Sequence, residues 1–154
     1  DGSITTFAVV AGVIGASLNS SIVLILGFAN LFADGFSMSV ANYMSTKSRN
    51  EMLKTPEKDE RKTAFATFIS FFSVGFIPLI SFVVAAVTKN SWLIANQFKG
   101  AFVLTGLSLL VIGWLKGVVT EKHRIKSAIQ TFLIGGGAAL LAFSAGKFIS
   151  GIVG

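Results

Sequence analysis

Four side chains in one apolar stretch of the sequence could together bind a metal ion. The stretch GFANLFADGFSM (Gly27–Met38) and the residues just after it place a polar or sulfur-bearing side chain at every fourth position: Asn30, Asp34, Met38 and Asn42. On an α-helix this spacing forms one stripe that drifts by about 40° at each step. Carboxylate, carboxamide and thioether groups together suit Fe²⁺ or Mn²⁺, whereas Ca²⁺ and Mg²⁺ gain nothing from sulfur. The stripe therefore predicts a site for a divalent transition-metal ion.

The composition indicates that this stripe lies in a membrane. Hydrophobic residues make up 53% of the 154-residue chain and charged residues only 13%, against about 25% charged residues in soluble domains. Cysteine is absent, which excludes disulfides, thiolate metal sites and cysteine nucleophiles. The net charge of +6 could indicate nucleic acid, but the bases cluster between apolar runs, so no nucleic acid partner is expected. We predict one all-α integral membrane domain over residues 1–154, embedded in the lipid bilayer.

Stretches without charge predict five transmembrane helices and the turns between them. The expected spans are about 1–18, 22–46, 63–88, 99–116 and 126–153, with a kink at Pro78. Trp92 and Lys99 are expected to bracket a short link before the fourth span. The apolar part of the first span is about 22 Å long, short of a ~30 Å hydrocarbon core. A helix that extends upstream of Asp1 would place this aspartate inside the membrane zone.

Asp34 is the residue of the stripe that most needs a functional explanation. A carboxylate inside a membrane must face the bundle interior, a water-filled cavity or a partner subunit. Asn30 could instead bridge two helices by a hydrogen bond, and Met38 could be ordinary packing. Close helix packing could bring Asp1 near Asp34. Three residues are candidates for supporting or pathway positions: Thr5, Ser37 and Asn42.

The distribution of basic residues predicts the orientation. The connector Lys47–Lys62 and the loop Lys116–Lys126 carry ten Lys and Arg residues, against three on the other side. The positive-inside rule then places both loops and the N-terminus in the cytosol. Four acids of the connector could attract metal ions to a cytosolic entrance, or form a solvated charged segment: Glu51, Glu57, Asp59 and Glu60. A prokaryotic plasma membrane is favoured, and a vacuolar-type membrane is the alternative.

Small residues predict helix contacts rather than chemistry. Ala11-x-x-x-Gly15, Gly12-x-x-x-Ala16 and the Gly/Ala-rich run at 135–146 allow close helix approach. No Ser/His/Asp set, HExxH or phosphate loop occurs, and the only histidine, His123, falls in a basic loop. We therefore expect no enzyme and no permanently bound cofactor; an intramembrane aspartyl protease would need a paired motif that is missing.

Several segments resemble one known family. DGSITTFAVVAGVIGASL at the start and SIVLILGFANLFADGFSMSVANYMSTKS after it resemble the first two helices of the vacuolar iron transporter family. KTAFATFISFFSVGFIPLISF and GWLKGVV resemble its third and fourth helices. The resemblance implies five transmembrane helices, a homodimer with the ion path at the subunit interface, and export of cytosolic Fe²⁺ or Mn²⁺ in exchange for protons.

The resemblance also assigns residues. The family's translocation acid in the first helix falls on Asp1, and its translocation methionine falls on Met38. Plant-type members carry a glutamate eight residues before that methionine, where this chain has Asn30; Asp34, one turn later, could replace it. Many members insert a Glu/Met-rich cytosolic helical domain between the second and third helices. The connector Lys47–Lys62 is too short for it, so the domain is expected to be lost, or missing near Asn50.

Two hypotheses of different classes follow. In the first, Asp1 and Asp34 bind Fe²⁺ or Mn²⁺ when deprotonated and release it on protonation, with Asn30 and Met38 completing the ligands and a second subunit doubling them. In the second, the chain is a non-transporting membrane anchor or assembly subunit that oligomerises through its Gly/Ala faces. Asp34 would then pair with a base on a partner.

Overall fold

Helices form every regular element in the described part of the chain. The computed structural model describes residues 1–53 and 58–153. The elements are α1 (Gly2–Gly15), α2 (Ser20–Leu53), α3 (Glu60–Phe76), the 3₁₀ turn η1 (Ile77–Leu79), α4 (Ile80–Thr88), α5 (Ser91–Val119) and α6 (Arg124–Val153). Because α3, η1 and α4 follow one another without a break, the described residues form five helical segments. The predicted all-α membrane fold is confirmed.

Four of the described segments are long and apolar enough to cross a membrane. They are Ser20–Leu53, Glu60–Thr88, Ser91–Val119 and Arg124–Val153, while Gly2–Gly15 is apolar but shorter. Large apolar side chains cover their outer surfaces: Phe102 is 62% exposed and Leu141 is 75% exposed. Contiguous apolar surface of this kind is rare on soluble monomers and fits contact with lipid.

The helix ends differ from the predicted spans where charged residues were taken as boundaries. α2 continues to Leu53 instead of ending near residue 46, and α5 begins at Ser91 instead of near residue 99. Lys, Arg and Glu are good helix formers, so a charge ends a membrane span without ending its helix. Trp92 and Lys99 therefore lie within α5, and the expected link between them is wrong. Asn90 starts α5 by accepting a hydrogen bond from the Trp92 backbone N–H at 2.9 Å.

Pro78 interrupts the third span as predicted. It lies in η1, where the helix tightens to 3₁₀ geometry for three residues before α4 continues. Proline has no backbone N–H to donate, so the regular α-helical bonding is broken there. Pro78 and its neighbour Leu79 are buried, and Leu79 packs against Gly27 of α2.

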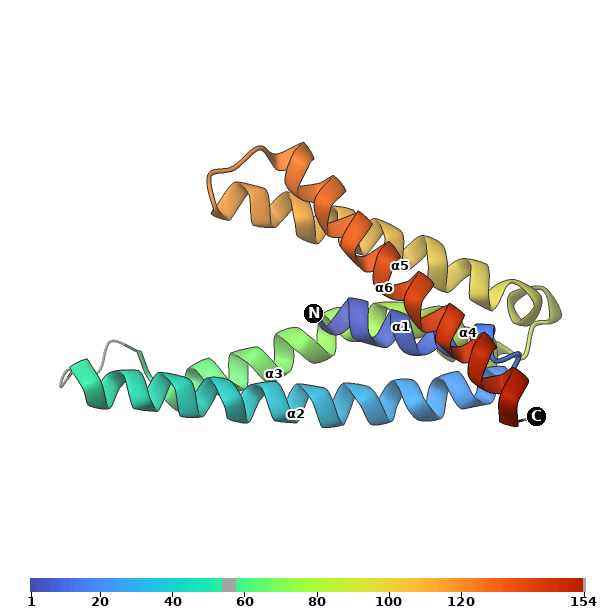
Figure 1. Ribbon diagram of the computed structural model, residues 1–154, viewed down its shortest axis with the longest axis horizontal. Helices are drawn as coiled ribbons and strands as arrows, with labels where there is room; N and C mark the ends of the chain where they lie inside the picture. Colours follow the sequence, from blue (N-terminus) through green and yellow to red (C-terminus); the bar gives the residue numbers. More distant parts are fainter. Residues whose placement is uncertain (54–57, 154) are drawn as a thin grey trace.

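The helices form two long hairpins with α1 between them (Figure 1). One hairpin is α2–α3 and the other is α5–α6, and the two diverge toward one end of the molecule. The end of α2, the start of α3 and the basic α5–α6 turn lie at that end, while the end of α6 and the α1–α2 and α4–α5 turns lie at the other. α1 starts about midway along the molecule (Figure 1), where Gly2 packs against Phe71 and Gly75 of α3. The described basic residues at the end of α2, the start of α3 and the α5–α6 turn thus group at one end, which agrees with the orientation that their charge predicts.

The predicted small-residue faces are contact surfaces within the chain. A Cβ atom on Gly15 of α1 would collide with the backbone carbonyl of Phe143 in α6, and one on Gly146 of α6 would collide with that of Gly12. Glycine at these positions allows α1 and α6 to touch through their backbones. By contrast, a Cβ atom on Gly137 of α6 would meet nothing within 4 Å. The small residues of α1 thus serve packing inside one subunit.

Aromatic rings fasten α2 to α3. Phe32 and Phe72 have ring centroids 5.2 Å apart, and Phe28 and Phe76 are 5.8 Å apart. Each pair sits one helical turn from the other, so the phenylalanines form a ladder along the antiparallel hairpin. Such pairs contribute about 0.5–1.5 kcal/mol each beyond their buried area. The ladder holds in register the two helices that carry most of the polar groups described below.

Asp59 starts α3, and this role predicts a pH-dependent contribution to stability. Its carboxylate accepts the backbone N–H groups of Arg61 at 2.9 Å and Lys62 at 3.1 Å. The Lys62 N–H above all holds the pKa of Asp59 below its ordinary value of 3.8. The cap therefore stabilises the protein fully above about pH 4, and this stabilisation is lost as the pH falls through the lowered pKa.

Replacing Asp59 by Ala should lower the melting temperature at neutral pH, whereas Asp59→Asn should lower it less because asparagine also caps helices. Thermal unfolding in detergent at neutral pH and at about pH 3 checks this. The difference between wild type and Asp59→Ala should shrink in acid. A difference that is equal at both pH values would contradict the assigned cap.

Candidate metal site

A hydrogen bond between α1 and α2 fixes the register of the predicted site. The side-chain amide of Asn30 donates to the hydroxyl oxygen of Thr5 at 3.4 Å, and both residues are half-buried. The two helices are joined by a short turn and run antiparallel (Figure 1). One turn further along α2, Asp34 therefore reaches the level of Asp1, which lies one turn before Thr5. Asn30 is thus an interhelical bridge, and this bridge places the two aspartates at one level.

Asp34 is a half-buried carboxylate in the middle of a membrane-crossing helix. No hydrogen bond or ion pair joins its side chain to any residue among 1–53 and 58–153. An ionised carboxylate without a partner costs several kcal/mol in an apolar environment. Something outside the described chain must therefore compensate this charge: a cation, water, a proton or a second subunit.

Asp1 and Met38 line one open groove of about 690 Å³. Both side chains are exposed, and Met38 is 37% exposed. Helix α3 also borders the groove. It contributes a row of hydroxyl groups at helical spacing: Thr63, Thr67 and Ser70. Two lysines, Lys58 and Lys62, also border it. The groove therefore offers a carboxylate, a thioether and hydroxyl oxygens, and a cation entering it must displace or pass two ammonium groups.

The hydroxyl row of α3 is the part of the groove that the sequence analysis did not assign. Thr63, Thr67 and Ser70 follow the i, i+4, i+7 spacing of one helix face, a pattern readable from the sequence. The Thr67 hydroxyl donates to the Thr63 carbonyl at 2.8 Å and accepts from the Asn42 side-chain amide at 2.6 Å. Asn42 therefore ties α2 to α3 beside the groove. Ser37 is exposed and does not border the groove.

The described acids of the connector have different surroundings. Asp59 caps α3, Glu60 accepts a hydrogen bond from the Asn50 side-chain amide at 3.3 Å, and Glu51 is exposed. Glu57 lies outside the described residues. In the described part of the chain, no group of three or more His, Asp or Glu side chains is close enough to hold a metal ion. A metal site in this chain must therefore use mixed ligands or acquire ligands from a second copy.

Over its described residues, the structure is thus an all-helical membrane protein in which α1, α2 and α3 border a groove with polar side chains at the start of α1. The model of the VIT family matches residues 1–63 and 54–147 of the chain. Together these segments cover nearly the whole sequence. The chain belongs to this family, the vacuolar iron transporter family.

Relatives support the assignment over nearly the full length. The chain is 26% identical to Vacuolar iron transporter 1 of Eucalyptus grandis, over 97% of this chain and 82% of the relative. It is 25% identical to Vacuolar iron transporter of Plasmodium berghei, over 97% of this chain and 78% of the relative. It is 24% identical to Vacuolar iron transporter 1 of Arabidopsis thaliana, over 97% and 82%.

The alignments also bear on the connector and on the membrane. The alignment with the Eucalyptus grandis protein spans 211 positions although this chain has only 154 residues, so the relative carries residues without a counterpart here. The two segments matched by the family model overlap at residues 54–63, in the second half of the connector. The relatives are named for the vacuole, which does not support the preference for a prokaryotic plasma membrane.

Proposed function

We propose that this protein transports a divalent transition-metal ion, Fe²⁺ or Mn²⁺, out of the cytosol in exchange for protons. One observation carries the proposal most: Asp34 is a membrane-embedded carboxylate without a partner in the described chain. It shares a helix face with Asn30 and Met38, and the Asn30–Thr5 bond brings it to the level of Asp1. The relatives named as iron transporters support a metal ion as the cargo.

Proton exchange would follow from the chemistry of the two carboxylates. A carboxylate binds a cation only when it is deprotonated, so metal and protons compete for the same oxygens. On the cytosolic side, deprotonated Asp1 and Asp34 would bind the ion, with the thioether of Met38 favouring a transition metal over Ca²⁺ or Mg²⁺. On a more acidic opposite side, protonation would neutralise both aspartates and release the ion. Transport would then run down the proton gradient.

A homodimer would complete the ligand set. One chain provides a single carboxylate, Asp1, to the open groove, while Asp34 lies outside the groove lining, and the described residues include no group of three acids or histidines. Two copies related by a two-fold axis would place each ligand type twice around one ion. The dimer would also cover the exposed Met38 and shield the ion from lipid. The basic loops would face the cytosol, in a vacuolar-type or a plasma membrane.

The structure weakens the alternative hypothesis of an anchor that oligomerises through Gly/Ala faces, because some of these faces are already used within the chain. The glycines of α1 and Gly146 of α6 pack against each other inside the chain. The anchor would still pair the charge of Asp34 with a base on a partner subunit. Metal binding separates the two hypotheses: a transporter should show a thermal shift in detergent with Fe²⁺ or Mn²⁺, and an anchor should show none.

The thioether of Met38 gives a sharp test of metal selectivity. Leucine has nearly the same volume, and such swaps cost less than about 1.5 kcal/mol of stability even in a core. Met38→Leu should therefore fold normally but lose uptake of Fe²⁺ or Mn²⁺ by on the order of tenfold, because sulfur no longer ligates the ion. Proteoliposome uptake driven by a pH gradient measures this.

Met44→Leu is the matched control, since Met44 is an exposed methionine on the same helix that does not border the groove. This variant should transport like wild type. Wild-type uptake by Met38→Leu, or an equal loss in Met44→Leu, would remove Met38 from the proposed ligand set.

A further inference from the structure

The turn between α5 and α6 has a fixed shape. Glu121 adopts a left-handed backbone conformation (φ 53°), and the Lys122 N–H donates to the Gly117 carbonyl at 3.0 Å, which closes the end of α5. The helices touch directly behind this turn, because a Cβ on Gly117 would lie 2.7 Å from the Arg124 Cα. A Cβ on Gly113 would likewise come within 2.6 Å of an α6 Cα atom. The backbone that carries the side chains of this turn is therefore well defined.

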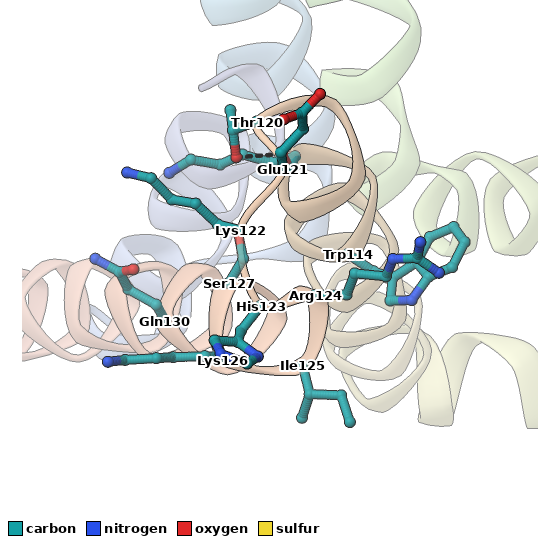
Figure 2. A pocket seen from close by; sticks show the side chains of 11 residues that line it. Trp114, Thr120, Glu121, Lys122, His123, Arg124, Ile125, Lys126, Ser127 and Gln130 are labelled. Atoms are coloured by element: carbon teal, nitrogen blue, oxygen red, sulfur yellow. Dashed lines mark hydrogen bonds between the residues drawn. The ribbon is translucent and has the colours of Figure 1, made fainter.

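Basic side chains surround a cavity of about 1070 Å³ at this turn (Figure 2). It is bordered by four cations, Lys116, Lys122, Arg124 and Lys126, and by His123, while its one acid is Glu121. No ion pair joins these four cations to another residue of the described chain. The cavity also lies at the N-terminus of α6, whose first turn has no acidic residue. Free N–H groups and the helix dipole there favour an anion.

An aromatic ring marks one wall of the cavity. The Arg124 guanidinium lies 5.9 Å from the centre of the Trp114 ring, and Figure 2 shows the two side chains beside each other, away from Lys122 and Lys126. Tryptophan is enriched at the level of lipid headgroups because its ring is apolar and its N–H is polar. A tryptophan beside this cavity is typical of a site at the level of the lipid headgroups.

An apolar groove continues from the basic cavity along α6. This second cavity, of about 900 Å³, shares His123, Ile125, Lys126 and Gln130 with the first, and its remaining lining is formed by apolar side chains of α6. Ile125, Ile129 and Leu133 follow at i, i+4 and i+8, so they form one stripe, and each is more than half exposed. The charged cavity thus adjoins an exposed apolar stripe that runs along α6.

We propose that this cavity and groove bind an anionic phospholipid. Lys122, Lys126 and the start of α6 hold its phosphate, and the stripe Ile125–Ile129–Leu133 holds one acyl chain. A nucleic acid has no acyl chain to cover the apolar stripe. A second copy of this chain, paired face to face here, would oppose the same basic residues to one another. The lipid is the occupant whose charge and shape match both halves of the site.

Quenching of Trp114 fluorescence tests the proposal in the full chain. In a Trp92→Phe background, Trp114 is the only tryptophan. The protein is reconstituted in phosphatidylcholine vesicles with increasing fractions of brominated phosphatidylglycerol, and then with brominated phosphatidylcholine of the same acyl chains. Saturable quenching at a low fraction of phosphatidylglycerol, well below that needed for phosphatidylcholine, is expected. Equal quenching by the two lipids would overturn the proposal.

Variants then assign the two halves of the site. Lys122→Gln/Lys126→Gln leaves the Arg124–Trp114 contact intact and should weaken phosphatidylglycerol binding about 25-fold, at about fivefold for each cation. The control Lys89→Gln/Lys147→Gln removes two charges that lie away from this turn and should change nothing. Ile129→Gln should weaken lipid binding, and inorganic phosphate should not displace the lipid. Displacement by phosphate, wild-type binding by Ile129→Gln, or an equal loss in the control would overturn a lipid site.

Discussion

Asp34→Asn is expected to reduce uptake of Fe²⁺ or Mn²⁺ by on the order of 100-fold or more. The substitution preserves the size of the side chain and removes only its negative charge, so α2 should fold unchanged. Loss of a group that merely orients a metal ligand already costs about 10–100-fold in affinity or activity, and loss of a ligand should cost at least as much. Loss of the charge also removes the acid–base group through which proton exchange would operate. Uptake into proteoliposomes with an acidic interior measures the effect.

The matched control for Asp34 is Asp59→Asn, which makes the same chemical change at the start of α3. Asp59 caps this helix and is exposed. Its asparagine variant should keep the cap and transport like wild type. Equal activity of wild type and Asp34→Asn would show that the intramembrane carboxylate has no part in transport, and the proposed mechanism would fail.

Gly146→Ala should be the most destabilising glycine-to-alanine change in α6. The new Cβ would run into the backbone carbonyl of Gly12, which cannot rotate away as a side chain could. Overpacking of this kind costs about 1–3 kcal/mol, or about 3–10 °C in melting temperature for a chain of this size. Thermal unfolding in detergent, followed by size-exclusion chromatography, reports the shift.

Gly137→Ala is the control for this packing contact, because it adds the same methyl group to the same helix in open space. Alanine favours a helix over glycine by about 1 kcal/mol, so this variant should be as stable as wild type or slightly more stable. If both variants melt at the same temperature, the backbone contact between α1 and α6 does not hold the fold together.

Membrane class, helix number and the polar stripe could be predicted from the sequence because each depends on local residue patterns. The gap between charges marked the spans, and four-residue spacing placed Asn30 and Asp34 on one face. The helix ends at Leu53 and Ser91 could not be predicted. Charged residues mark where a segment leaves the hydrocarbon core of the membrane, but the helical hydrogen bonds can continue beyond that point. Trp92 and Lys99 were misplaced for this reason.

The contacts between helices could be predicted only in part. Small residues at Gly12, Gly15 and Gly146 indicated contact faces, but no local pattern tells whether such faces meet within one chain or between two. The role of Asn42 depends on Thr67, which lies 25 residues away. The α3 hydroxyl row was readable as a helix face, yet only the structure shows that it borders the groove of Asp1 and Met38.

The most direct test of a transition-metal site is a structure determined after soaking with Mn²⁺ or Fe²⁺, with anomalous scattering to locate the ion. We expect an anomalous peak within ligand distance of Asp34 and Met38, close to the start of α1, and its disappearance in Asp34→Asn. A peak that is absent there, or unchanged in the variant, would contradict the claim that this face of α2 binds the transported metal.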